Sequence, residues 1–140
     1  MAKVNLTTEL PVPVETVWGM IGNFNALARW HPAVEKSEEL KEGTATVRKL
    51  SLRGGGTIVE RLESKDDKGH AYSYSIIESP LPVSGYKSQL RVRPGKNTSS
   101  CTVEWSSEFE PTTAPENEAV KAIRGIYEAG FQNLHKMFGK

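Results

Sequence analysis

The chain of 140 residues is 37% hydrophobic and 25% charged, and its 18 basic and 17 acidic residues give a formal net charge of +1. This balance excludes the strongly basic surface on which most nucleic-acid binding depends, so we predict no nucleic-acid partner. No apolar run approaches the ~20 residues of a membrane span, and the N-terminus lacks the apolar core of a secretory signal. The single cysteine, Cys101, cannot form an intramolecular disulfide. We therefore predict one cytoplasmic domain over residues 1–140.

The first predicted element is a strand from Lys3 to Leu10, in which apolar and polar residues alternate. A short amphipathic helix begins at Pro13, because proline fits the first turn of a helix, and it ends at Gly22-Asn23. A second short helix from Phe24 to Trp30 ends at His31-Pro32, since the residue before a proline avoids the helical region.

Six further strands follow, joined by connections of hairpin length. They are predicted at Val34–Leu40, Thr44–Leu52, Thr57–Ser64, His70–Glu78, Tyr86–Arg93 and Ser99–Glu110, the last being the longest. Hairpin connections require antiparallel pairing, and a strongly twisted sheet of seven such strands tends to curl. The loop Ser79–Gly85 carries apolar Leu81 and Val83 among prolines. We expect it to be buried against the mouth of a pocket or against a neighbouring chain.

The last segment, Glu116 to Phe138, is the only long one with helical periodicity. Its apolar residues recur at spacings of three and four: Ala119, Val120, Ile123, Ile126, Tyr127, Gly130, Phe131, Leu134, Met137 and Phe138. The concave side of a curled sheet would cover this stripe. The predicted fold is therefore α+β, with a seven-stranded curved antiparallel sheet around a long C-terminal helix and two short helices after the first strand.

Strand alternation also predicts which residues face that helix. They are Ile58, Glu60 and Leu62; Tyr72, Tyr74 and Ile76; Tyr86, Ser88, Leu90 and Val92; and Cys101, Val103, Trp105 and Phe109. A buried carboxylate such as Glu60 must meet a cation, a hydrogen-bond donor, water or a ligand. Apolar walls with a few polar groups are typical of a small-molecule cavity. The alternative is that Glu60 lies at the rim of the sheet and reaches solvent.

Several local strings occur in an order typical of one superfamily. They are Pro13-x-x-x-Val17-Trp18 with Phe24 and Trp30, Glu60-Arg61-Leu62 with Asp66-Asp67, Tyr72-Ser73-Tyr74-Ser75, and Tyr86-Lys87-Ser88. Together they resemble the helix-grip (SRPBCC, START-like) superfamily over essentially the whole chain. This group includes polyketide cyclases and dehydrases, START lipid-transfer domains, the birch-pollen allergen and the plant abscisic-acid receptors.

The resemblance implies pocket positions that can be transferred residue by residue. The ligand-pairing lysine of the receptors corresponds to His31, and their other pocket residues correspond to Glu60, Tyr86, Ser88 and Asn133. The gate motif of those receptors is absent from Ser51–Gly55, and their latch motif is absent from Leu81–Val83. Hormone recognition is therefore not implied.

Combining alternation with the resemblance gives ten predicted ligand-binding residues: Trp30, His31, Glu60, Tyr74, Leu81, Tyr86, Ser88, Trp105, Ala129 and Asn133. An ungapped match to the receptors would place Glu104 inside, whereas strand alternation places Trp105 there. We follow the alternation. Ala129 is included because Gly125, Ala129 and Gly130 leave room beside Asn133 on the final helix.

Acid–base chemistry has two candidates, His31 and Glu60, since a histidine titrates near neutrality. The alternative for His31 is a helix-end histidine bonded to the backbone. The three histidines share no metal-ligand spacing, so we predict no metal and no cofactor. Cys101 falls on an apolar strand face and is expected to be an inert buried thiol.

We therefore predict that a small, largely apolar organic or lipid-like ligand binds between the sheet and the C-terminal helix. One alternative is a polyketide cyclase/dehydrase-like enzyme that uses His31 and Glu60 for proton transfer. Another is a protein-interaction module that uses Ser79–Gly85. Gly54–Gly56 is either a flexible lid or a wide turn. The expected oligomeric state is a monomer or a weak homodimer.

Overall fold

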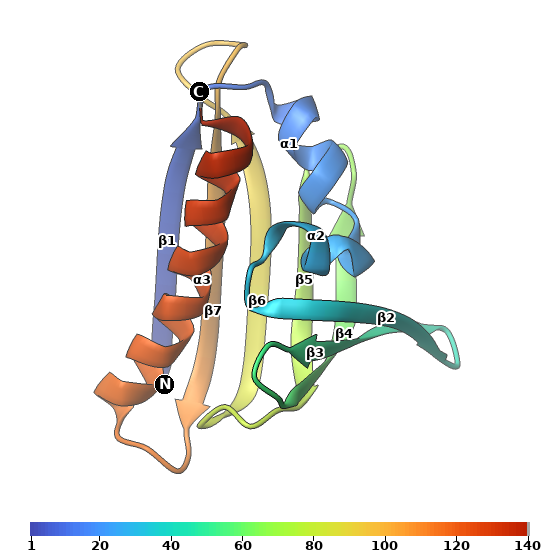
Figure 1. Cartoon of the computed structure of the whole chain (residues 1–140), viewed down its shortest axis with the longest axis vertical. Helices are drawn as coiled ribbons and strands as arrows, with labels where there is room; N and C mark the ends of the chain where they lie inside the picture. The colour runs from blue at the N-terminus through green and yellow to red at the C-terminus, as the bar shows by residue number, and fades with distance from the viewer. Residues whose placement is uncertain (140) are drawn as a thin grey trace.

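The computed structural model describes residues 1–139, and its elements follow the predicted order (Figure 1). The strands are β1 (Ala2–Leu10), β2 (Val34–Glu42), β3 (Ala45–Leu52), β4 (Thr57–Asp66), β5 (Ala71–Glu78), β6 (Val83–Pro94) and β7 (Cys101–Pro111). The helices are α1 (Val14–Ile21), the short 3-10 helix η1 (Phe24–Ala26), α2 (Leu27–Trp30) and α3 (Glu116–Phe138). The strands form one antiparallel sheet in the order β1-β7-β6-β5-β4-β3-β2, which confirms the predicted fold.

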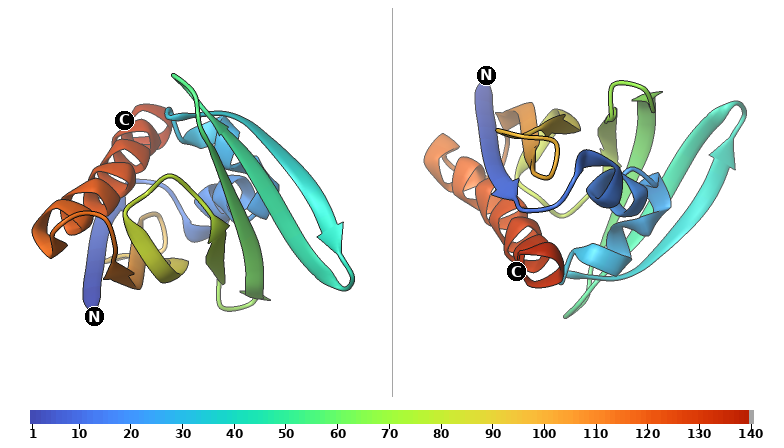
Figure 2. Two further views of the ribbon diagram at one scale, coloured as in Figure 1. Left: turned by 90° about the horizontal axis from the view of Figure 1, so that it is seen from below. Right: turned by 90° about the horizontal axis from the view of Figure 1, so that it is seen from above.

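The sheet curls around α3, which lies on its concave face (Figure 2). The helix packs over β1 and β7, at one side of the sheet, while α1 contacts β6 and α2 contacts β2 (Figure 1). The helices therefore share the concave face, and the core lies between them and the sheet. The β2–β3 hairpin extends away from α3 on the opposite side (Figure 1).

Burial along β7 follows the predicted alternation. Its inward residues, Cys101, Val103, Trp105, Ser107 and Phe109, are all buried. The residues between them are half-buried or exposed. Because side chains alternate along a strand, this pattern fixes the register against β1 and β6.

The second short helix differs from its prediction, because Phe24–Trp30 is not a single helix. The Asn23 side chain accepts a hydrogen bond from the Asn25 N–H at 3.0 Å, and the Ala26 N–H donates to the Asn23 carbonyl at 3.0 Å. These bonds form the tight turn of η1. One turn of α-helix, α2, then follows to Trp30.

Strand β6 is longer than predicted and includes the end of the expected Ser79–Gly85 loop. It has 12 residues against 11 in β7, so the prediction that the last strand is the longest is wrong. Pairing begins at Val83, opposite Pro111, and the register shifts between Ser84 and Lys87. Gly85 adopts a φ of 60° at this irregularity, a conformation that glycine tolerates best.

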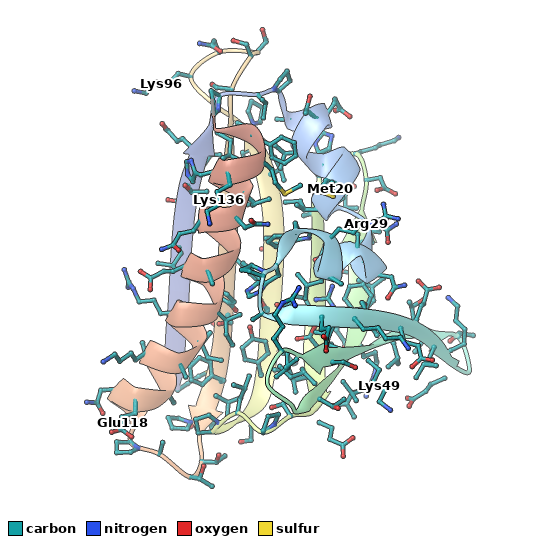
Figure 3. The ribbon with its side chains drawn as sticks, viewed as in Figure 1. Met20, Arg29, Lys49, Lys96, Glu118 and Lys136 are labelled. Carbon is teal, nitrogen blue, oxygen red and sulfur yellow. The ribbon has the colours of Figure 1, made fainter. Side chains whose placement is uncertain are left out.

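Helix α3 has the predicted bounds and buries one face. Its buried residues are Ala119, Ile123, Tyr127, Gly130, Phe131 and Leu134. Met137, which belongs to the predicted stripe, is 38% exposed. Figure 3 shows Glu118 in the first turn and Lys136 near the end of the helix, both exposed. No helix within residues 1–139 is long and apolar enough to cross a membrane.

At Gly130, α3 passes close to three buried rings, which belong to Trp30 and His31 at the end of α2 and to Trp105 on β7. A Cβ atom at this position would lie 3.0 Å from the His31 ring and 3.1 Å from the rings of Trp30 and Trp105. Contacts this short require the rings to shift by a few tenths of an ångström before a methyl group fits, and the packing here is therefore adapted to glycine.

We predict that Gly130→Ala lowers the free energy of unfolding by about 1–3 kcal/mol, because three buried rings must move to admit the methyl group. Gly125→Ala is the matched control, since a Cβ there meets no atom within 4 Å. The control should be neutral or stabilising by up to about 1 kcal/mol, because alanine favours helix. Urea denaturation of the two variants measures both effects, and equal effects would contradict the packing argument.

Candidate functional site

A cavity of about 250 Å³ lies between the concave face of the sheet and the first half of α3. Its apolar wall includes Leu27, Val34, Leu50, Ile58, Ile76 and Ile123. Its polar lining consists of His31, Arg53, Glu60, Tyr74, Tyr86 and Tyr127. Exposed Ala33, Arg53 and Gly55 and half-buried Leu81 also line it, and these residues mark its mouth.

A second, open hollow of about 410 Å³ lies against the sheet. Exposed charged residues such as Lys3, Lys87 and Glu108 line it. It offers little apolar wall to an organic molecule, so we consider the sheet–helix cavity to be the candidate site.

Six of the ten predicted ligand-binding residues line this cavity: His31, Glu60, Tyr74, Leu81, Tyr86 and Trp105. Trp105 is 2% exposed and faces inward, as strand alternation predicted, whereas Glu104 is on the other face and bonds Arg93. Leu81 places the β5–β6 loop at the pocket mouth, one of the two locations expected for it.

The other four, Trp30, Ser88, Ala129 and Asn133, do not line the cavity. The Asn133 side chain donates to the Trp30 carbonyl oxygen at 2.8 Å, so it fastens α3 to the end of α2. Trp30 packs against Trp105 with ring centroids 5.4 Å apart. Ser88 belongs to a hydrogen-bond chain behind the cavity wall, and Ala129 is half-buried on α3.

Glu60 meets a cation, one of the partners that its burial required. The cation is Arg48, which is fully buried and directly opposite Glu60 across the β3–β4 hairpin. Arg48 Nε donates to Glu60 Oε1 at 2.8 Å, and Arg48 Nη2 lies 2.7 Å from the same oxygen. Glu60 is 5% exposed, which overturns the alternative that it lies at the rim and reaches solvent.

The surroundings of Arg48 compensate for the loss of water. Its guanidinium carbon lies 3.9 Å from the ring centroid of Phe24 and 4.9 Å from that of Tyr74. Burial disfavours its charge, but Glu60, Tyr72 and Tyr74 together outweigh this and raise the pKa of Arg48. For the acid Glu60 burial has the opposite effect and raises the pKa, and the nearby charge of Arg48 only partly offsets this increase. At these distances we consider the pair to be ionic.

Sequence reasoning missed Arg48, although a signal for it exists. The β3–β4 hairpin pairs residues symmetrically about Gly54, so Ser51 faces Thr57 and Arg48 faces Glu60. Gly54, Gly55 and Gly56 all adopt positive φ, between 85° and 106°, which only glycine adopts at low cost. The centre is the first glycine of the run, so a hairpin centred on Gly54 predicts the pair, whereas one centred on Gly55 would set Leu50 opposite Glu60.

His31 lines the cavity with both ring nitrogens already bonded. The backbone N–H of Ala33 donates to Nδ1 at 3.1 Å, so Nδ1 is an acceptor. Nε2 therefore carries the proton and donates to the Ile126 carbonyl at 2.7 Å. Burial lowers the pKa of His31, the bond to Ile126 raises it, and Arg48 lowers it further, with a net decrease. His31 is thus a neutral histidine bonded to backbone, the alternative stated from the sequence.

A directed chain of hydroxyl groups leads from Tyr86 and Tyr127 on the cavity wall to Ser88, which does not line the cavity. Ser88 donates to the Ser106 carbonyl at 2.9 Å, so its oxygen accepts from Tyr127, which lies 3.0 Å away. Tyr127 has then used its proton and accepts from Tyr86. The Tyr86 oxygen is left as an acceptor. Burial raises the pKa of Tyr127 to about 12, so the chain stays protonated near neutral pH.

Tyr74 supplies the one hydroxyl proton on the cavity wall that the protein does not use. Its oxygen accepts the Trp105 Nε1–H at 3.0 Å, and its own O–H has no acceptor among residues 1–139. Burial raises the pKa of Tyr74 well above its ordinary range. The group is therefore a neutral donor.

Residues 1–139 contain no group of three or more His, Cys, Asp or Glu side chains placed to hold a metal ion. Cys101 is buried, and burial raises the pKa of its thiol, which disfavours the reactive thiolate.

We predict that His31 makes stability depend on pH below its ordinary pKa of 6.5. As the pH falls below 6.5, His31 is protonated in the unfolded chain but stays neutral in the folded protein, because its pKa is lowered there. The free energy of unfolding should therefore fall by up to about 1.4 kcal/mol per pH unit. His31→Gln keeps a donor toward Ile126 but cannot titrate. Between about pH 6.5 and pH 5.5 this variant should therefore lose less unfolding free energy than the wild type does. Urea denaturation across this range tests this. Exposed His135→Gln is the control, and a wild-type slope unaltered in His31→Gln would contradict it.

We predict that the Arg48–Glu60 pair is strongly coupled. Glu60→Gln leaves a buried cation unpaired and should cost about 3–5 kcal/mol of unfolding free energy. The double variant Arg48→Met/Glu60→Leu removes both charges and should lose less than Glu60→Gln alone, because no charge is left without its partner. A double-mutant cycle with Arg48→Met and Glu60→Leu measures the coupling; additive losses would show that the pair is not coupled.

Comparison with solved structures gives extensive similarity, while comparison with curated proteins gives no significant match. The protein XoxI from Bacillus cereus is 39% identical, with a TM-score of 0.94 over 99% of this chain and 96% of that one. The Zhui aromatase/cyclase from a Streptomyces species is 20% identical, with a TM-score of 0.73 over 94% and 87% of the two chains. Norcoclaurine synthase from Thalictrum flavum is 19% identical, with a TM-score of 0.71 over 97% and 92%. The last two show a shared fold.

The profile of one protein family matches residues 1–139, almost the whole length of the chain. The family is described as "Polyketide cyclase / dehydrase and lipid transport". Together with the sheet that curls around α3, this match confirms the resemblance drawn from the sequence. The chain belongs to the polyketide cyclase/dehydrase and lipid transport family and has the helix-grip fold of START proteins.

Proposed function

We propose that the protein binds a small, largely apolar organic molecule in the cavity between the sheet and α3. The observation that supports this is a cavity of about 250 Å³ with a mainly apolar wall. An apolar cavity of about 150 Å³ admits benzene, whereas sites for drug-sized ligands begin near ~300 Å³. The volume therefore suits a molecule of one or two fused rings, or a short aliphatic chain.

The relatives support this function at the level of the family. The family description includes lipid transport, which requires a site for an apolar molecule. The mouth between Ala33, Gly55 and Leu81 gives such a molecule a route from solvent. Burial of apolar ligand surface against this wall would supply the affinity.

The two alternative functions have less support. The relatives named as an aromatase/cyclase and a synthase are 20% and 19% identical, so the likeness to them concerns the fold alone. The structure does not pair His31 with Glu60 for proton transfer, because Glu60 bonds Arg48 and both His31 nitrogens bond the backbone. For an interaction module, Leu81 would have to face outward, but it lines the cavity.

Titration with indene, a bicyclic hydrocarbon, tests the proposal. We expect saturable NMR shifts of the methyl groups of Ile58, Ile76 and Ile123, which line the cavity. Ile126→Trp should abolish these shifts, because Ile126 is half-buried at the wall and an indole ring there would fill the space.

Lys121→Trp provides the matched control, since it adds the same side chain at an exposed position of α3. This variant should bind indene as the wild type does. Circular dichroism checks that both variants are folded. Indene shifts that persist in folded Ile126→Trp would refute binding in this cavity, and so would the absence of shifts in the wild type with both indene and indole, its analogue with an N–H donor.

A further inference from the structure

We propose, on the basis of the ligand-binding function above, that the cavity selects a neutral ligand with an N–H or O–H donor directed at Glu60 Oε2. The inference concerns the part of the ligand that reaches the inner end of the cavity. It rests on how the hydrogen-bonding capacity of the cavity wall is already used.

The first observation is that Arg48 occupies only one oxygen of Glu60. Both close contacts, from Nε at 2.8 Å and from Nη2 at 2.7 Å, are to Oε1. Oε2 accepts no hydrogen bond from residues 1–139. It is nevertheless not fully enclosed by protein atoms. Since Glu60 lines the cavity, its remaining accessible oxygen opens there. A carboxylate oxygen in apolar surroundings is a strong acceptor.

The second observation is the pattern of the other polar groups on the wall. The hydroxyl chain ends at Tyr86 with an oxygen that accepts, and His31 has no free nitrogen. Tyr74 is the one wall hydroxyl with a free proton in the described part of the chain. Away from the mouth, where Arg53 is exposed, the wall thus offers acceptors at Glu60 and Tyr86 against a single donor, Tyr74. A ligand with a donor satisfies a buried group that an ether or a hydrocarbon leaves unpaired.

The third observation concerns charge. Arg48 and Glu60 neutralise each other, and Arg48 is 0% exposed, so its charge is not available to an anion in the cavity. A carboxylate at the inner end would face the like charge of Glu60, and an ammonium group would lose its hydration close to Arg48. The lining cation Arg53 is exposed at the mouth, where its Nε donates to the Pro32 carbonyl at 2.7 Å. The inner end is therefore suited to a neutral group.

Indole and indene test this assignment, because they share a shape and differ by one N–H donor. Wild-type protein should bind indole at least about tenfold more tightly than indene in NMR titrations. The preference should fall to about twofold or less in Arg48→Met/Glu60→Leu, which removes the acceptor without leaving a buried charge unpaired. Tyr86→Phe removes the other acceptor and should retain the preference.

The outcomes separate this inference from the proposed function. Binding of neither probe to wild-type protein overturns ligand binding itself, and this assignment with it. Equal binding of indole and indene overturns the assignment alone. The preference for indole could instead be lost in Tyr86→Phe and kept in Arg48→Met/Glu60→Leu. This result would assign the ligand donor to Tyr86, and so overturn the role of Glu60.

Discussion

The ion pair between Arg48 and Glu60 is a buried polar contact that constrains much of the interior around it. Two charges without water are stable only when each finds a partner, so β3 and β4 must keep the register that sets them opposite each other. The rings of Phe24 and Tyr74 then have to cover the guanidinium. This requirement draws η1 toward the sheet and leaves one carboxylate oxygen facing the cavity.

The cavity wall is held at its other side by contacts between α2 and α3. His31 bonds the Ile126 carbonyl, Asn133 bonds the Trp30 carbonyl, and Gly130 lets three rings approach the helix backbone. His31 and Asn133, which the resemblance assigned to the ligand pocket, thus fix the position of the helix. Substituting them would change the shape of the cavity as well as its lining.

The fold was predictable from the sequence because alternation along the strands and periodicity in residues 116–138 are strong, local signals. The same alternation correctly placed Glu60, Tyr74 and Trp105 inside. It failed at Arg48, because Val47 and Arg48 are adjacent and both buried, so no simple alternation includes the two. It also could not show that Asn133 bonds the backbone, since that depends on how closely α2 approaches α3.

The arrangement of polar groups gives the cavity a direction. Its ionic groups belong to the β3–β4 side, whereas its hydroxyl groups come from β5, β6 and α3. A symmetric hydrocarbon would be free to turn end over end in such a space, but a molecule with one polar end would not. A bound molecule would therefore adopt a single orientation, presenting the same end to the mouth each time it enters.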